Sequence, residues 1–274
     1  MRFCTKWGSS DHIRNLLVKL LDQHKLIGRT PGTRRPDDAY VAKLAQAIYA
    51  GRPDQAADAA AAALAEGIEP EAVGEAMALA ANQLLLCDGG RAEAVGTKSK
   101  YSVHGDSVGV HASDAANAWR HIARVSNPRN AVASLIVAAC NVTPNVGNNS
   151  HLGKDLYPLP EHLEKVQGKD AAALLREVES AIRANDQALA CAAVHRYGEQ
   201  GHPARAIFDL LLKYAVSEDG ALHAEKYYRT ASEEFAAARP AFRWRQLLAL
   251  ARVTASEFGQ PAAGFAEACK LLKV

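Results

Sequence analysis

Two similar stretches, AIYAGRPDQAADAAAAALAEG (residues 47–67) and AIRANDQALACAAVHRYGEQG (residues 181–201), decide the fold of this chain. Each begins with Ala-Ile, carries Asp-Gln-Ala, and continues as a run that ends at a glycine. Alanine has the highest helix propensity and a glycine commonly follows the last helical residue, so both stretches predict helices. Apolar residues recur at helical spacing along most of the chain, and no stretch shows a convincing alternation typical of a strand. The sequence therefore predicts an all-α fold.

The two stretches open a longer repeated pattern. In both copies a proline near the start of the next helix is followed by Asp-Gly, by His-Ala, and by a second proline. Recurring patterns indicate duplicated structural units. We therefore expect a single all-α domain over residues 1–274, with two copies of about four helices each at about 47–142 and 181–254. N-terminal helices precede the first copy, and a linker loop is expected over 143–160. The matching residues are Pro70 and Pro203, Asp88 and Asp219, His111 and His223, and Pro128 and Pro240.

Caps and breakers give the expected helix boundaries. Prolines begin helices at their first turn, and glycines end them. A glycine-rich stretch from Asp88 to Gly109 breaks the first half, and we expect Ser113 and Asp114 to cap the helix that follows it. Pro128 opens the next helix. In the second half, helices are predicted near 169–184, 186–198, 203–217, 220–238, 240–257 and 261–273.

Charge and cysteine usage exclude several classes of protein. The formal net charge of the 274 residues is +2 and spread evenly, whereas a nucleic-acid-binding protein usually shows a basic stripe. No apolar run is long enough for a transmembrane span, and the first residues contain no apolar segment of a secretory signal. The five cysteines are scattered without a CxxC, which is typical of structural thiols in a reduced compartment. We expect a cytoplasmic protein that contacts neither membrane nor nucleic acid.

Histidines are the candidate metal ligands. The chain contains ten, and imidazole binds zinc and non-haem iron well. If the duplication holds, the equivalent residues His111 and His223 meet at the interface of the two halves, where bundles commonly hold metals and ligands. The spacings between the histidines match no named metal motif, so the ligand set stays open. The candidate metal ligands are His104, His111, His223, His121 and His195.

Metal-free chemistry is an alternative at the same place. In that case His111 acts as a general base. Asp114, Asn117 and His121 form a polar stripe on one helix face, and Asp114 is a candidate to orient a histidine. The opposing interpretation of the stripe is a solvated face. Our candidate catalytic residues are His111, His223 and Asp114.

Two further patterns surround these histidines. Gly105-Asp106-Ser107-Val108-Gly109 reads G-x-S-x-G, the sequence of a hydrolase nucleophile elbow, but the parallel sheet that this elbow requires is missing. The glycines instead indicate a sharp turn or a close backbone approach. An anion site at the helix N-terminus is a further alternative, which Asp106 and Asp114 weaken by adding negative charge.

The chain also resembles two known families. LAEGIEPEAVGEAMALAANQ (64–83) looks like the helical hairpin of carboxymuconolactone decarboxylase and alkylhydroperoxidase-like proteins, whose redox members rely on a CxxC that is absent here. The run from VHGDSVGVHASDAANAWRHIAR (103–124) through VSNPRNAVASLIVAAC to DLYPLP is similar to questin-oxidase-like proteins and to helical regions that follow Rieske domains. This second resemblance implies oxidation of an organic substrate, with His104, His111 and His223 as the matching positions.

The sequence thus predicts a metal-dependent enzyme, with non-haem iron or zinc, that acts on a small organic substrate between the two halves and is an oxidoreductase if the resemblance holds. No iron–sulfur motif (C-x-H with C-x-x-H) and no nucleotide motif occurs in the chain. The rival hypothesis is a non-catalytic helical-repeat scaffold, because stacked helical hairpins form extended binding surfaces. A homo-oligomer or a subunit of a larger complex fits either hypothesis.

Overall fold

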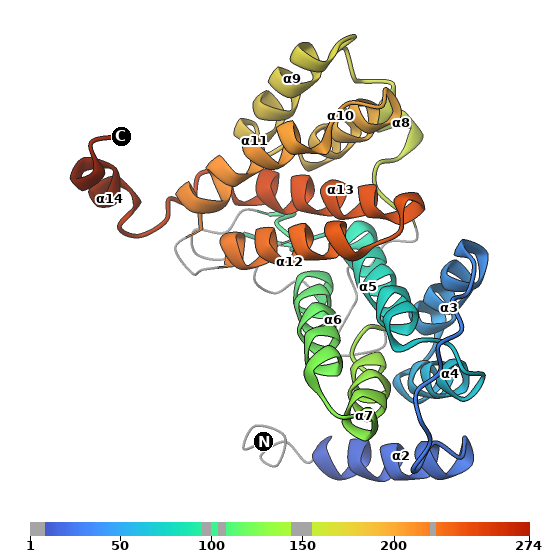
Figure 1. Ribbon diagram of the computed structural model, residues 1–274. Coiled ribbons are helices and arrows are strands. Elements are labelled where there is room, and N and C mark those ends of the chain that lie inside the picture. Colours follow the sequence, from blue (N-terminus) through green and yellow to red (C-terminus); the bar gives the residue numbers. More distant parts are fainter. Residues whose placement is uncertain (1–8, 95–99, 104–107, 144–154, 220–222) are drawn as a thin grey trace. The chain divides into compact units, whose positions relative to one another are not determined.

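The computed structural model confirms the all-α prediction (Figure 1). It describes residues 9–94, 100–103, 108–143, 155–219 and 223–274. Within these ranges there are helices and two isolated β-bridges but no strand. None of the described helices is both long and apolar enough to cross a membrane. The helices are α2 (Ser9–Gln23), α3 (Asp38–Ala50), α4 (Pro53–Ala65), α5 (Pro70–Cys87), α6 (Val108–Val125), α7 (Pro128–Ala139), α8 (Pro160–Leu163), α9 (Ala171–Arg183), α10 (Gln187–Glu199), α11 (Ala204–Ser217), α12 (His223–Ala237), α13 (Pro240–Glu257) and α14 (Phe265–Leu272).

The described residues fall into two compact units. Unit 1 comprises those within 1–84 and 115–149, and unit 2 those within 85–114 and 150–274. In unit 1, α4 packs against α2, α3 and α7. Its buried positions are mostly alanines, which let helix backbones approach closely. These unit boundaries differ from those of the predicted duplication.

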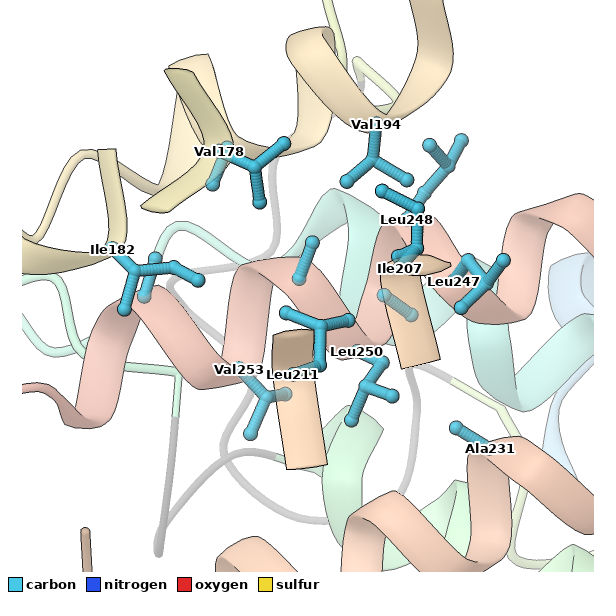
Figure 2. Close-up of a cluster of buried hydrophobic side chains, with 14 of the residues drawn as sticks. Val178, Ile182, Val194, Ile207, Leu211, Ala231, Leu247, Leu248, Leu250 and Val253 are labelled. Carbon is cyan, nitrogen blue, oxygen red and sulfur yellow. The ribbon is translucent and has the colours of Figure 1, made fainter. Parts of the chain in front are cut away.

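Unit 2 is built around α13, which packs against α9, α10, α11 and α12. Every residue from Gln246 to Glu257 is buried, so the second half of this helix is covered on all sides. The core around it contains buried hydrophobic side chains, and those labelled in Figure 2 come from α9, α10, α11, α12 and α13. The side chains labelled there are Val178, Ile182, Val194, Ile207, Leu211, Ala231, Leu247, Leu248, Leu250 and Val253.

The predicted helix boundaries of the second half agree with the structure within four residues. One boundary prediction in the first half is wrong. We expected Ser113 and Asp114 to cap a helix, but α6 already begins at Val108, so both residues lie inside it. His111 is therefore helical and does not precede the helix.

Tertiary packing explains this earlier start of α6. Val110 is completely buried, and Gly109 lies so close to α5 that a Cβ atom added there would stand 2.4 Å from the backbone nitrogen of Leu85. Only glycine allows such an approach without displacing the backbone. The second glycine of the G-x-S-x-G pattern thus serves a close contact between helices. Residues 104–107, with His104 and Ser107, lie outside the described part of the chain.

Candidate functional site

His111 and His223 meet within unit 2. His111 lies in the first turn of α6 and His223 begins α12. Their ring centroids are 6.0 Å apart and the ring planes are inclined by 74°, an edge-to-face arrangement. His111 is exposed, and the side chain of His223 keeps 27% of its surface exposed. The two imidazoles can therefore face one small molecule or ion from two helices.

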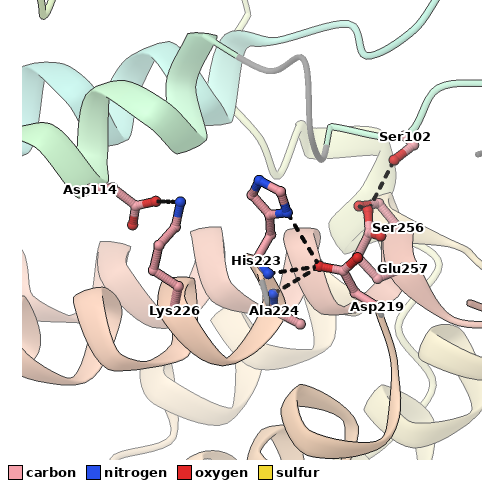
Figure 3. A network of polar contacts seen from close by, with 8 residues as sticks. All are labelled: Ser102, Asp114, Asp219, His223, Ala224, Lys226, Ser256 and Glu257. Atoms are coloured by element: carbon pink, nitrogen blue, oxygen red, sulfur yellow. Dashed lines mark hydrogen bonds and ion pairs between the residues drawn. The ribbon is translucent and has the colours of Figure 1, made fainter. Parts of the chain in front are cut away.

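Asp219 caps the start of α12 and lies beside the ring of His223. One oxygen of its carboxylate accepts the backbone N–H groups of His223 at 2.9 Å and Ala224 at 3.1 Å. These are donors that a helix N-terminus leaves without an intrahelical partner. The same oxygen stands 3.8 Å from Nδ1 of His223, an ion-pair contact (Figure 3). Asp219 is 2% exposed and has a φ of +61°, so its position is set by the surrounding packing.

Asp114 connects α6 to α12 beside the histidines. Its carboxylate pairs with the ammonium of Lys226 at 2.8 Å (Figure 3). It also accepts the hydroxyl of Thr230 at 2.7 Å. The prediction that Asp114 orients a histidine stays untested, because these contacts are with other side chains. Of the two aspartates, it is Asp219 whose carboxylate lies beside the ring of His223.

Two buried hydroxyl groups, those of Tyr227 and Ser113, lie on the same two helices as the histidines. Tyr227 lies one helical turn after His223, and its hydroxyl oxygen is inaccessible to solvent, as is that of Ser113. Burial, followed by the negative charge of Asp114, raises the pKa of Tyr227 well above its ordinary value. Tyr227 therefore stays protonated at neutral pH and can act as a hydrogen-bond donor but not as a base.

Helix α13 contributes two further buried charged residues, Glu257 and Arg252. Glu257 is 1% exposed and accepts the hydroxyl groups of Ser102 at 3.1 Å and Ser256 at 3.2 Å (Figure 3). Earlier on the same helix, Arg252 is 2% exposed and donates to the carbonyl oxygens of Leu85, at 2.7 Å, and Asp88. A guanidinium is well placed at the carbonyl end of a helix, here α5.

Aromatic packing completes the site of Arg252. The guanidinium carbon lies 4.0 Å from the ring centroid of Tyr157, a cation–π contact. Burial lowers the pKa of Arg252, but the guanidinium remains charged because its ordinary pKa is so high. Arg252 thus connects α13 to the segment that leads toward α6.

The remaining predicted ligands are placed as follows. His195 pairs with Glu199 on α10, with 3.3 Å between Nε2 and Oε1. His121 is exposed ten residues after His111 on α6, about 15 Å along the helix axis. Among the described residues, no three or more His, Cys, Asp or Glu side chains form a group that could hold a metal ion. The metal assignment of His121 and His195 stays a prediction.

Sequence reasoning missed Asp219 and Arg252 as site residues. Asp219 was used only as a marker of the repeat, although an acidic residue shortly before a helix is a cap signal. Arg252 is a single cation within LLALARVTA, and an isolated charge in an apolar helix indicates a buried partner. Comparisons of the chain with protein-family models, curated proteins and solved structures found no match.

Proposed function

We propose that the protein is an enzyme that acts on a small organic substrate and that His111 and His223 are its reacting groups. The observation that carries this proposal is the 6.0 Å separation of their rings, which come from residues 112 positions apart in the sequence (223 − 111). Histidine is the side chain whose unperturbed pKa lies closest to neutrality, so a pair can accept one proton and donate another.

Asp219 assigns different roles to the nitrogens of His223. A carboxylate beside Nδ1 favours the tautomer that carries its proton there. Nε2 is then the nitrogen with an available lone pair. In the metal-free form of the proposal, Nε2 of His223 takes a proton from the substrate, and His111, which faces it, supplies or receives the second proton. This exchanges the roles in our sequence-based interpretation, which made His111 the base.

A metal-dependent form is the second candidate, and the ring spacing is compatible with it. A metal–nitrogen distance of about 2.0–2.1 Å places two ligating imidazoles with centroids roughly 5–6 Å apart. The observed 6.0 Å lies at the upper end of this range. Such an ion would supply Lewis-acid chemistry or, with iron, the oxidation that the family resemblance implies. A third protein ligand would have to come from residues such as His104, outside the described ranges.

The proposed duplication supports a shared role for the two histidines. In the described parts of 38–139 and of 171–257, the structure has five successive longer helices, and the first two in each set have 13 residues. The second helix of each set is followed by a glycine with positive φ, Gly67 or Gly201. His111 and His223 then occupy the first turn of the fourth helix in each set.

Elemental analysis distinguishes the two forms. We would purify the untagged protein without chelator beside the His111→Ala/His223→Ala double variant, with His195→Ala as the control. About one zinc or iron per chain, lost in the double variant and retained in His195→Ala, would support the metal-dependent enzyme. The absence of metal in all three proteins would leave the metal-free form to be tested.

The metal-free form is tested by histidine NMR. A library of small organic molecules would be titrated while the ring signals of His111 and His223 are followed, after assignment with the single variants. We expect a compound class that shifts both signals and no longer binds the double variant. If nothing binds and the double variant has wild-type stability, the enzyme proposal is wrong and the scaffold hypothesis takes its place.

A further inference from the structure

Lys226 places a positive charge beside the histidine pair. It lies three residues after His223 on α12, and residues at this spacing share a helix face, with about 5–6 Å between their Cβ atoms. Figure 3 shows both side chains extending from α12 toward α6. On α6, Asp114 likewise lies three residues after His111. Two histidines, one ammonium and one carboxylate therefore meet across two helices, all within unit 2.

The position of the ammonium is set by a partly buried carboxylate. Asp114, whose side chain is 14% exposed, contacts Nζ of Lys226 at 2.8 Å and accepts the hydroxyl of Thr230 at 2.7 Å. An ammonium has three N–H donors, and the contact with one carboxylate oxygen occupies one of them. The side chain of Lys226 is 47% exposed, so a ligand can reach the ammonium. Lys226 thus offers a donor that is held in place before a ligand binds.

The ion pair restricts the kind of oxygen that Lys226 can bind. Asp114 already neutralises the ammonium, and it would repel a second carboxylate at the same place. A neutral carbonyl oxygen can accept an N–H group of the ammonium while Asp114 stays bound. If that oxygen gains negative charge during a reaction, the ammonium binds the transition state more strongly than the ground state, which accelerates the reaction.

We propose that the substrate is a ketone or aldehyde with hydrogen on the carbon next to the carbonyl group, and that Lys226 is a catalytic residue that binds the carbonyl oxygen. This proposal rests on the metal-free form of the proposed function, in which Nε2 of His223 takes a proton from the substrate. The carbonyl oxygen and the adjacent carbon of such a molecule are about 2.4 Å apart. With a contact of about 3 Å at each end, this group is large enough to bridge His223 and Lys226 on one helix face.

The proposed reaction moves one proton and needs no oxidant. His223 takes the proton from the carbon next to the carbonyl group, and the electrons of that C–H bond form a C=C bond. The carbonyl electron pair moves to the oxygen, and Lys226 stabilises the resulting enolate. His111, protonated at the start, returns a proton to the same carbon or, in a β,γ-unsaturated ketone, to the γ carbon. A proton passed from His223 to His111 through solvent restores the enzyme.

Exchange of carbon-bound hydrogen for deuterium tests the proposal. Cyclohexanone and 3-cyclohexen-1-one would be incubated with the protein in D₂O, and NMR would follow the hydrogens next to the carbonyl group and the formation of the conjugated isomer. We expect rates about 100-fold higher with the wild type than with the His111→Ala/His223→Ala variant, because general acid–base catalysis is lost. Rates equal to those of the double variant for both ketones would overturn the proposal.

The histidine signals separate this failure from a failure of the proposed function. If the ketones shift the ring signals of His111 and His223 but do not exchange, the reaction class is wrong and the histidine site stands. If no compound shifts these signals and the double variant has wild-type stability, the enzyme proposal fails as a whole.

Two variants and one control assign the role of Lys226. Lys226→Met removes the donor and should lower kcat for exchange about 100-fold. This change leaves Asp114 without its cation, so Lys226→Met/Asp114→Asn is made as well. The double change removes both charges and keeps an oxygen acceptor for Thr230, so it should fold and be equally slow. Lys213→Met is the matched control, because Lys213 on α11 is also half-exposed and pairs with Glu179 at 2.9 Å.

The kinetic parameter that changes distinguishes a catalytic role from a structural one. A group that stabilises the enolate affects kcat more than KM, and the urea stability of the double change should stay near that of the wild type. A kcat of wild-type size in both Lys226 variants would show that the ammonium does not bind the carbonyl oxygen. A decrease of the same size in Lys213→Met would equally overturn the assignment.

Discussion

Helix α4 of unit 1 and the cluster around α13 of unit 2 bury residues of different size. In unit 1 the buried face of α4 consists of Ala56, Ala57, Ala60, Ala61, Ala63 and Leu64. In unit 2 the cluster around α13 consists mainly of leucines, valines, isoleucines and tyrosines, with alanines among them. The phenylalanine rings of α11 and α12 and Trp244 pack against this cluster. Short side chains bring helix backbones close together, whereas large ones fill a wider space.

This difference predicts which core substitutions destabilise each unit. A helix face of buried alanines has no room for added atoms, and a cluster of large side chains cannot lose them without a cavity. The units also hold a buried arginine differently. Arg120 in unit 1 contacts the carboxylate of Glu71, whereas Arg252 in unit 2 contacts backbone carbonyls and an aromatic ring.

The largest loss of stability should follow Arg252→Ala in unit 2. The change removes a donor from the carbonyl oxygens of Leu85 and Asp88 and opens a cavity beside Tyr157. Together these effects should lower the free energy of unfolding by about 4 kcal/mol. Urea denaturation followed by circular dichroism measures the loss, with exposed Arg205→Ala as the control. A loss no larger than that of the control would show that the buried guanidinium contributes nothing.

Leu211→Ala tests the packing of the large-residue core. Leu211 is completely buried in the cluster around α13, so the truncation should cost about 3 kcal/mol. The exposed residue Leu212, one position later on α11, provides the control Leu212→Ala. Midpoints and slopes of urea curves give both values. Similar values for the two variants would contradict the placement of α11.

Ala60→Leu tests the alanine core of unit 1 in the opposite sense. Ala60 is completely buried on α4, and the added atoms should destabilise the protein by about 2 kcal/mol through overpacking. Lys43→Leu on α3 gives an exposed control for the added leucine. A thermal midpoint at or above that of the wild type would mean that α4 is packed more loosely than described.

Asp219→Ala probes the link between a cap and the histidine site. Losing the cap of α12 should cost about 1 kcal/mol. Asp219→Asn should retain most of this stability, because an amide oxygen also accepts backbone N–H groups, while it removes the charge beside Nδ1 of His223. Stability and the NMR titration of His223 would be measured for both variants. If the His223 titration is the same in Asp219→Asn and wild type, the ion pair has no influence on the ring.

The smallest expected effect is on the pH dependence of stability, through His162 in unit 2 and Glu71 in unit 1. Burial lowers the pKa of His162 in unit 2, so the unfolded chain binds its proton first and stability falls as the pH drops below about 6.5. For Glu71 in unit 1, burial raises the pKa but Arg124 and Arg120 lower it further. Its contribution to stability is present above its unfolded pKa and is lost as the pH falls through the lower folded value.

Denaturation at a series of pH values checks both expectations. His162→Gln should remove part of the decrease between pH 7 and the folded pKa of His162, and Glu71→Gln should flatten the curve only below its unfolded pKa. The opposite assignment of the two pH ranges would contradict the burial of these residues.

Local sequence patterns were sufficient for most helices and for the choice of the two histidines. The boundaries of α9 to α13 followed from prolines, glycines and apolar spacing, because these signals act within one helical turn. The start of α6 could not be predicted from local patterns, because Ser113 and Asp114 are residue types that commonly cap a helix. Their positions depend on the contact of Gly109 with Leu85, which lies 24 residues earlier (109 − 85).

The sequence by itself determined that the chain is helical, because propensity and spacing act between residues close in the chain. It also singled out His111 and His223 through their matching positions. Only the tertiary structure decided that Asp219 stands beside His223, that Asp114 pairs with Lys226, and that two arginines surround Glu71. These contacts depend on how helices pack, and packing is set by side-chain shapes and burial over long sequence distances rather than by any local pattern.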